Sequence, residues 1–170
     1  MFNRFARSLG ICVIGLGALA ASDALALDAP SGPVILVVSG AIGTTNVGDE
    51  AHFDRAMLAA LPQHDTLTHT PWHDDRIRFS GPLGRTLLQA VDARGSRMRV
   101  TALNGYASTI PVADFHEHDV ILALAADGEP LSVRDQGPLF VIYPFDDEPD
   151  LSNKLILSRS VWQVERIVID

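Results

Sequence analysis

The sequence predicts one α+β domain over residues 34–170, built mostly from strands with a few short helices. Short apolar runs bounded by glycine, proline and polar residues are typical of strands. Only two stretches repeat apolar residues at helical spacing, and Asn-Gly and Asp-Gly pairs mark tight turns between strands. A length of 170 residues suits one domain, and no repeat, low-complexity tract or linker divides it.

The first 26 residues predict a cleavable export signal. Arg4 and Arg7 precede an apolar run from Leu9 to Ala21, and Ala24-Leu25-Ala26 gives the small-x-small pattern that signal peptidase accepts. The run is shorter than the roughly 20 apolar residues of a permanent membrane anchor, although an uncleaved anchor is the alternative. We expect cleavage after Ala26, which leaves residues 27–33 as a loose leader of the exported chain.

Charge and cysteine content narrow the class of function. The chain has 13 basic and 21 acidic residues, a net charge of −8, and removal of the signal leaves 11 and 20. An acidic surface without a basic stripe repels phosphate backbones, so we expect no nucleic-acid partner. Cys12, the only cysteine, lies in the signal. The mature chain therefore forms no disulfide, and a packed apolar core must stabilise it.

The first predicted strand is residues 34–38, whose unbroken apolar sequence indicates burial on both faces. A loop rich in glycine and threonine follows over residues 41–49. Asp49 is expected to cap the first helix, and Pro62 to end it. The apolar positions at helical spacing in this helix are Phe53, Met57, Leu58 and Leu61.

Two short strands are predicted next, over residues 64–70, with Leu67 on one face, and residues 77–79. Asp74-Asp75 is expected to turn the chain between them. The second helix is predicted to begin near Ser80 or Gly81 with Pro82 in its first turn, where the missing N–H costs nothing. Its buried stripe is Leu83, Leu87, Leu88 and Val91, and Arg94-Gly95-Ser96 closes it.

The rest of the chain predicts mainly strands. Residues 97–103 alternate, with Met98, Val100 and Ala102 on one face, and Asn104-Gly105 turns the chain into a return strand. The remaining expected elements are a return strand at 106–110, a short turn or helix at 111–117, a buried strand at 120–125, a hairpin turn at 127–128, a buried strand at 139–143, an acidic loop at 145–153, a segment of uncertain type at 154–157, and a terminal strand through Val161, Val164, Ile167 and Ile169.

Six short motifs also occur in order: Phe79-Ser80-Gly81-Pro82, Leu103-Asn104-Gly105-Tyr106, Ile110-Pro111, Asp127-Gly128-Glu129-Pro130-Leu131, Gly137-Pro138-Leu139 and Arg159-Ser160-Val161. Each alone is weak, but their order and spacing resemble the molybdopterin-binding domain of the sulfite oxidase fold across residues 34–169. The similarity is closest to short exported members that bind pterins. The resemblance implies the sulfite oxidase fold and a pterin ligand. It also implies that the protein acts in the periplasm on an inner-membrane enzyme that makes or degrades cyclic-di-GMP.

Departures from the family pattern imply a pterin without molybdenum. Catalytic members bind the metal through a cysteine thiolate, which the mature chain lacks. Phe140 stands where an arginine commonly follows Gly-Pro-Leu. Trp162 replaces the lysine of a Ser-Val-Lys-Trp stretch, and Gln163 replaces its tryptophan. A cation that could face a phosphate has become an aromatic surface.

Trp162 is the strongest candidate for pterin contact, because an indole can stack on a flat heterocycle with about 1–3 kcal/mol. The alternative is a core or interface tryptophan. The resemblance implies that Arg159 and Ser160 hydrogen-bond the ligand, although Arg159 could equally be a surface residue. The turn at Asn104 and Tyr106 could form the rim of the pocket or be a plain hairpin.

Tyr143 ends a buried strand before Pro144, where it could face a ligand or the core. A carboxylate could bind the guanidine-like edge of a pterin, and the sequence does not choose among Asp114, Asp146 and Asp147. The histidines do not match the spacing of a closed zinc site and are expected to be solvated. They are His64, His69 and His73, with Asp74 and Asp75 nearby, and His116 and His118.

The leading hypothesis is a non-catalytic periplasmic pterin receptor that reports its occupancy to the periplasmic part of a membrane signalling enzyme. Two alternatives stay open. One is a molybdopterin-dependent oxidoreductase with unusual metal ligation. The other is an interaction module with a vestigial pocket, in which Trp162 serves only the core.

Overall fold

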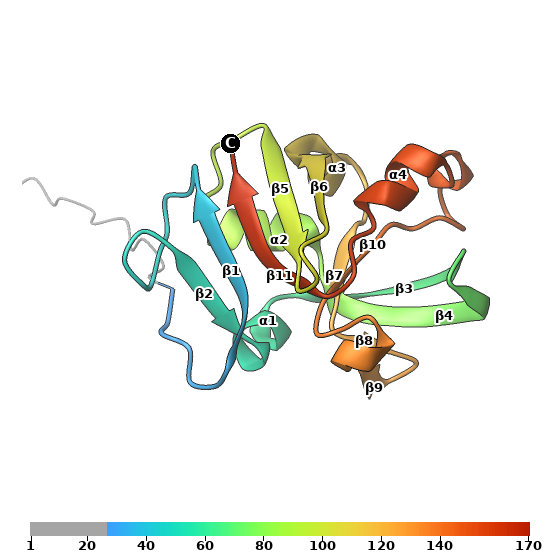
Figure 1. The fold of residues 1–170 in the computed structure, drawn as a ribbon, viewed down its shortest axis with the longest axis horizontal. Helices are drawn as coiled ribbons and strands as arrows, with labels where there is room; N and C mark the ends of the chain where they lie inside the picture. The colour runs from blue at the N-terminus through green and yellow to red at the C-terminus, as the bar shows by residue number, and fades with distance from the viewer. Residues whose placement is uncertain (1–26) are drawn as a thin grey trace, which may run out of the picture.

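A computed structural model describes residues 27–170, so the predicted signal peptide lies outside the described residues. The fold is mixed α and β, with most elements being strands (Figure 1). The strands are β1 (Val34–Gly40), β2 (Ala51–Asp54), β3 (Gln63–Thr70), β4 (His73–Pro82), β5 (Arg97–Ala102), β6 (Ala107–Pro111), β7 (Ile121–Ala123), β8 (Ala125–Ala126), β9 (Glu129–Pro130), β10 (Phe140–Ile142) and β11 (Val164–Ile169). The helices are α1 (Arg55–Ala60), α2 (Gly84–Ala90), α3 (Val112–Glu117) and α4 (Lys154–Arg159), with 3-10 turns η1 (Val133–Asp135) and η2 (Pro149–Leu151).

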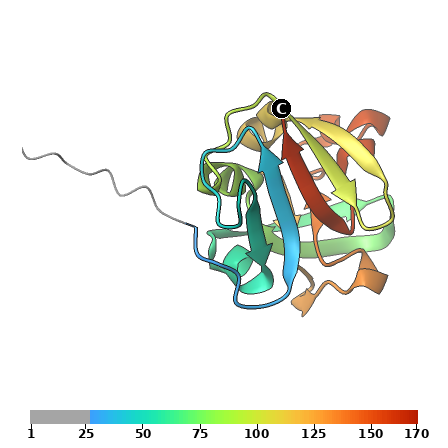
Figure 2. The ribbon, with the colours of Figure 1, turned by 60° about the vertical axis from the view of Figure 1, so that its left-hand side comes forward.

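The strands of residues 27–170 form three sheets. The largest has the order β2-β1-β11-β5-β6, in which β1 and β11 are parallel and the other pairs antiparallel. The last strand therefore lies between β1 and β5, as the red arrow beside the blue one shows in Figure 2. A second sheet has the order β3-β4-β8-β9, and β10 pairs with β7 in a third. The β3–β4 hairpin extends away from the largest sheet (Figure 1).

Within residues 27–170, two apolar clusters form the core. The larger one packs the inner face of the five-stranded sheet against the helices, and Leu36, Met98 and Ile167 belong to it. The smaller one joins the other two sheets around Phe79 and Phe140. Trp72, Ile77, Leu83, Ala126 and Trp162 pack against this smaller cluster.

The first strand is not buried on both faces, as its sequence suggested. Leu36 and Val38 are buried, but Ile35 and Val37 are half-buried and Val34 is exposed. Strands β5 and β11 of the same sheet also have exposed or half-buried residues at alternate positions. The sheet is thus covered on one face only, and an apolar run cannot reveal that a neighbouring layer is missing.

The prediction of a helix from Asp49 was wrong at its start. Residues 51–54 pair with β1 as β2, and the helix begins at Arg55. Asp54 is its cap, since the carboxylate accepts a hydrogen bond from the Met57 amide at 2.8 Å. That bond and those from the amides of residues 32 and 31 lower the pKa of Asp54 to about 2. Residues 27–33 are therefore attached to the domain, not loose.

The turn predicted at Asp74-Asp75 was also wrong. The chain reverses at Pro71-Trp72, because Thr70 pairs with His73, and both aspartates lie within β4. This strand extends to Pro82, so the second helix begins only at Gly84. The buried face of β3 carries threonines in place of the expected Leu67, which is half-buried; they are Thr66, Thr68 and Thr70.

Other sequence predictions are confirmed. The β5–β6 hairpin turns at Asn104-Gly105 with Gly105 at a φ of +83°, and a helix covers 112–117. The buried strand predicted at 139–143 appears as β10, the Asp127-Gly128 turn joins β8 to β9, and the strand predicted at 120–125 divides into β7 and β8. The undecided segment at 154–157 is the start of α4, capped by Asn153. The terminal strand is present but begins only at Val164, so Val161, which was predicted to belong to it, lies outside it.

Candidate functional site

A cavity of about 290 Å³ lies where the β5–β6 turn, the end of α4 and the tip of the β3–β4 hairpin meet. We call it the aromatic cavity. Its volume is at the lower end of the roughly 300–1,000 Å³ of small-molecule sites, so it suits a ligand of one or two rings. The lining residues are Trp72, Ala102, Asn104, Tyr106, Leu157, Ser160, Val161 and Trp162.

The turn between β5 and β6 forms the rim of this cavity, and two hydrogen bonds hold it in place. The Asn104 side-chain oxygen accepts a hydrogen bond from the Tyr106 amide at 2.9 Å, which stabilises the turn locally. The Tyr106 hydroxyl donates to the Ser158 carbonyl of α4 at 2.8 Å. This bond ties the β5–β6 turn to the helix on the other side of the cavity. The ring of Tyr106 remains about half exposed.

Trp162 lies between α4 and β11, and it is half-buried. Its ring centroid is 5.4 Å from that of Trp72, with an interplanar angle of 80°. It is also 6.1 Å from Phe140, again edge to face. Phe140 is fully buried behind the two indoles. Trp162 thus packs on the smaller core cluster and also lines the cavity, so it is neither sealed in the core nor free on the surface.

Sequence reasoning missed the second tryptophan of the site. Trp72 reaches the cavity from the hairpin tip, about 90 residues before Trp162 in the chain. The signal that could have found it is Thr70-Pro71-Trp72, because an aromatic residue placed in a two-residue turn projects from the end of a hairpin. Ser160 lines the same cavity, and its hydroxyl donates to the Ile156 carbonyl at 3.3 Å.

Two predicted contact residues lie elsewhere. Arg159 Nη1 is 2.9 Å from Asp114 Oδ2, and the Tyr143 hydroxyl donates to the same oxygen at 2.7 Å. Burial, reinforced by the Asp114 carboxylate, raises the pKa of Tyr143 far above its usual range. Neither Arg159 nor Tyr143 lines the aromatic cavity. Both bind Asp114 of α3, so Asp114 is engaged as well.

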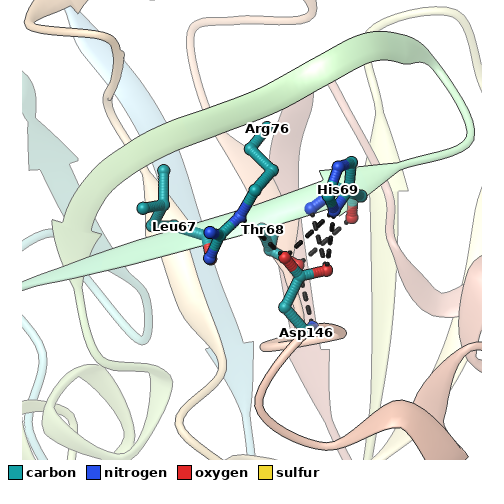
Figure 3. Close-up of polar contacts among 5 residues, drawn as sticks. All are labelled: Leu67, Thr68, His69, Arg76 and Asp146. Carbon is teal, nitrogen blue, oxygen red and sulfur yellow. Dashed lines mark hydrogen bonds and ion pairs between the residues drawn. The ribbon is translucent and has the colours of Figure 1, made fainter.

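Asp146 is engaged at the other side of the hairpin (Figure 3). Its carboxylate accepts a hydrogen bond from the His69 amide at 3.1 Å, contacts the His69 ring and lies 2.9 Å from Arg76 Nε. Its own amide donates to the Thr68 hydroxyl at 3.1 Å. Burial acts to raise the pKa of Asp146, but the His69 hydrogen bonds and the Arg76 charge outweigh it and lower that pKa. We call this group the Asp146 junction.

A second, more open cavity of about 580 Å³ adjoins the Asp146 junction. Asp147 lines it, together with Thr70 and Pro71 of the hairpin tip. The tip therefore contributes to both cavities, since the next residue, Trp72, lines the aromatic one.

The histidines expected to be solvated are partly engaged. His73 Nδ1 lies 2.7 Å from the Thr70 hydroxyl, and His118 Nδ1 lies 2.6 Å from Glu148. Across residues 27–170, no group of three or more His, Cys, Asp or Glu side chains is placed to hold a metal ion.

In comparisons with known proteins, no family model matches the chain and no curated sequence matches it. In the part of the chain that the structure describes, no helix has the length and apolar character needed to span a bilayer.

Proposed function

We propose that this protein is a non-catalytic pterin-binding receptor of the sulfite oxidase fold, exported to the periplasm, and that the aromatic cavity is its ligand site. One observation carries the proposal. Four of the six residues expected to contact a pterin, Asn104, Tyr106, Ser160 and Trp162, line a single cavity although they come from separate segments.

The chemistry of the cavity suits a flat heterocycle with polar edges. An indole face of Trp162 or Trp72 stacks on the ring system and contributes about 1–3 kcal/mol. The amide of Asn104, the hydroxyls of Ser160 and Tyr106 and the two indole N–H groups are the polar groups of mainly apolar walls, and a few such groups fix the orientation of a bound ring. The pterin carbonyl and ring nitrogens are their complements.

The β3–β4 hairpin offers a route by which occupancy is read. Its tip carries Trp72 on one side and joins the Asp146 junction on the other. A ligand that displaces Trp72 shifts the tip and orders the loops around Asn104 and Asp146. The altered surface is then recognised by the periplasmic part of an inner-membrane enzyme of cyclic-di-GMP metabolism.

The test is a titration of purified residues 27–170 with a reduced pterin, followed by intrinsic fluorescence. Both tryptophans of the chain line the cavity, so the whole tryptophan signal reports on this site. We expect a saturable change, and Trp162→Ala should weaken binding about tenfold or more. Leu155→Ala is the matched control, because Leu155 is an exposed apolar residue of α4 outside the cavity lining.

Absence of any saturable change in the wild type, or equal affinity in Trp162→Ala, overturns the proposal. Trp72→Phe and Trp162→Phe each leave one fluorescent reporter. They therefore show separately whether the hairpin tip and the α4–β11 connection both sense the ligand.

An interaction module is the second candidate, and exposed apolar residues favour it. Leu103 and Tyr106 at the β5–β6 turn and Leu155 on α4 are each about half exposed. Under this alternative, Trp162→Ala lowers stability by about 1–3 kcal/mol, less than the cost for a fully buried aromatic, and no pterin binding exists to be lost.

A further inference from the structure

We infer that the aromatic cavity selects its ligand by charge: it takes a neutral pterin-class heterocycle and rejects the same ring system bearing an anionic substituent. The inference rests on the proposed function and extends it from a ring system to a ligand class. It excludes phosphorylated or carboxylated pterins as the species sensed.

The composition of the lining disfavours an anionic ligand. None of its eight side chains is Lys, Arg or His. Its polar groups are one amide, two hydroxyls and the two indole N–H groups, none of which carries a charge. Both hydroxyls already donate to backbone carbonyls of α4, Tyr106 to Ser158 and Ser160 to Ile156. A carboxylate or phosphate needs donors, and those that bind it strongly are cationic or backbone N–H groups. An anion that enters this cavity loses hydrogen bonds to water, and the lining replaces few of them.

The cation that is closest to the lining residues in the sequence is already paired. Arg159 directly precedes Ser160, yet its guanidinium is turned away and bound to Asp114 at 2.9 Å, with 16% of the side chain exposed. The Tyr143 hydroxyl binds the same carboxylate and helps to hold it in place. Turning Arg159 toward the cavity would leave Asp114 mostly buried without its counter-ion, which is strongly unfavourable.

The charge distribution of the aromatic walls also disfavours an anionic ligand. Indole and phenol faces carry the negative part of the ring quadrupole, so they attract cations and repel anions. Trp72 and Trp162 stand nearly perpendicular in one corner of the cavity, and the Tyr106 ring adds a third aromatic surface. The net charge of −8 adds a longer-range repulsion of anions, which salt screens over roughly 8 Å at physiological ionic strength.

The uncharged lining and the paired Arg159 together set the expected size of the discrimination between neutral and anionic ligands. An unpaired carboxylate that loses water in a largely apolar site is disfavoured by enough to weaken binding at least about tenfold. The part that comes from local desolvation persists at high salt, whereas the part that comes from net charge is screened.

The experiment compares two nearly isosteric probes by calorimetry, 6-hydroxymethylpterin and pterin-6-carboxylate, at low salt and at 1 M NaCl. We expect the hydroxymethyl compound to bind and the carboxylate to bind at least about tenfold more weakly at both salt concentrations. Comparable affinities for the two probes overturn charge selection while leaving pterin binding in place. Binding of neither probe overturns this inference, and the titration with a reduced pterin then decides the proposed function separately.

A variant with an added cation tests whether the lining of the cavity causes the charge selectivity. Leu157→Lys introduces a cation into the lining at a half-buried position, where the lysine stem covers the apolar wall while its ammonium reaches the solvent-facing side. We expect the preference for the hydroxymethyl probe to fall by about tenfold or to reverse. Leu155→Lys is the matched control on the same helix and should keep the wild-type preference.

A folded Leu157→Lys protein with the wild-type preference overturns the assignment of selectivity to the lining. Circular dichroism and a thermal midpoint establish that both variants fold. If Leu157→Lys does not fold, the comparison of the two probes on the wild type decides the inference alone.

Discussion

Replacing Arg159 by methionine should lower the free energy of unfolding far more than replacing an exposed arginine whose ion pair is equally short. Methionine keeps most of the apolar stem and removes the guanidinium, which leaves Asp114 with the Tyr143 hydroxyl alone. The two charged side chains are only 16% and 12% exposed. Breaking a buried pair on one side costs about 3–5 kcal/mol, and the remaining exposure points to the lower end, about 3 kcal/mol.

The assay is urea unfolding of residues 27–170 followed by circular dichroism. In thermal unfolding of the same variants, a loss of about 3 kcal/mol corresponds to a fall of about 10 °C in the midpoint for a domain of this size. The control is Arg85→Met, since Arg85 lies 2.7 Å from Asp119 but the two side chains are 39% and 49% exposed. An exposed pair is worth below about 1 kcal/mol.

A double-mutant cycle with Tyr143→Phe completes this test. Because Arg159 and Tyr143 contact the same carboxylate oxygen, their effects should be non-additive by about 0.5–3 kcal/mol. Equal losses in Arg159→Met and Arg85→Met would refute the reasoning. So would an Arg159→Met protein of wild-type stability that has lost pterin binding, because that result places the guanidinium at the ligand.

Two further predictions concern the elements that frame the site. The pKa of Asp146 is lowered in the folded state, so the contribution of the Asp146 junction is complete above the ordinary carboxyl range and is lost as the pH falls below about 4. The difference in thermal midpoint between wild type and Asp146→Asn should therefore be present at pH 7 and shrink below a pH of about 4. A difference that does not change with pH contradicts this expectation. Asp75→Asn is the control, because Asp75 is exposed. Gly81→Ala should destabilise the domain by roughly 3 kcal/mol or more, because the added Cβ would overlap the Leu122 carbonyl, whereas Gly32→Ala meets only ordinary contacts with Asp54. Similar midpoints of urea unfolding for the two glycine variants would contradict that account.

Where local chemistry is unambiguous, the predicted elements match the structure. The β5–β6 hairpin is an example, because strict alternation and an Asn-Gly turn agree on one register. Residues 51–54 are the counter-example. The spacing of Phe53 and Met57 fits a helix, but the free edge of β1 takes this segment as a strand. Tertiary pairing overrides a local preference that is worth only tenths of a kcal/mol per residue.

The residues of the candidate site also divide into those that the sequence identified and those that it missed or misassigned. Trp162, Ser160, Asn104 and Tyr106 were identified from motifs along the chain, and the cavity that they line follows from packing. Trp72 was missed, because its place in the site depends on a hairpin that folds back across many intervening residues. Arg159 and Tyr143 were chosen as ligand contacts, but both face Asp114.

Residue types and their spacing were enough to predict the class of the fold, most turns and a set of candidate residues, and they show that residues 27–170 contain no cysteine. Which of the candidate side chains share a cavity, and which bind one another, became clear only from the packed fold. The physical reason is that residue type and spacing specify the local backbone and the apolar face. The partner of a long polar side chain is instead chosen by the nearest opposite charge after packing, and for Arg159 that charge comes from 45 residues earlier in the chain.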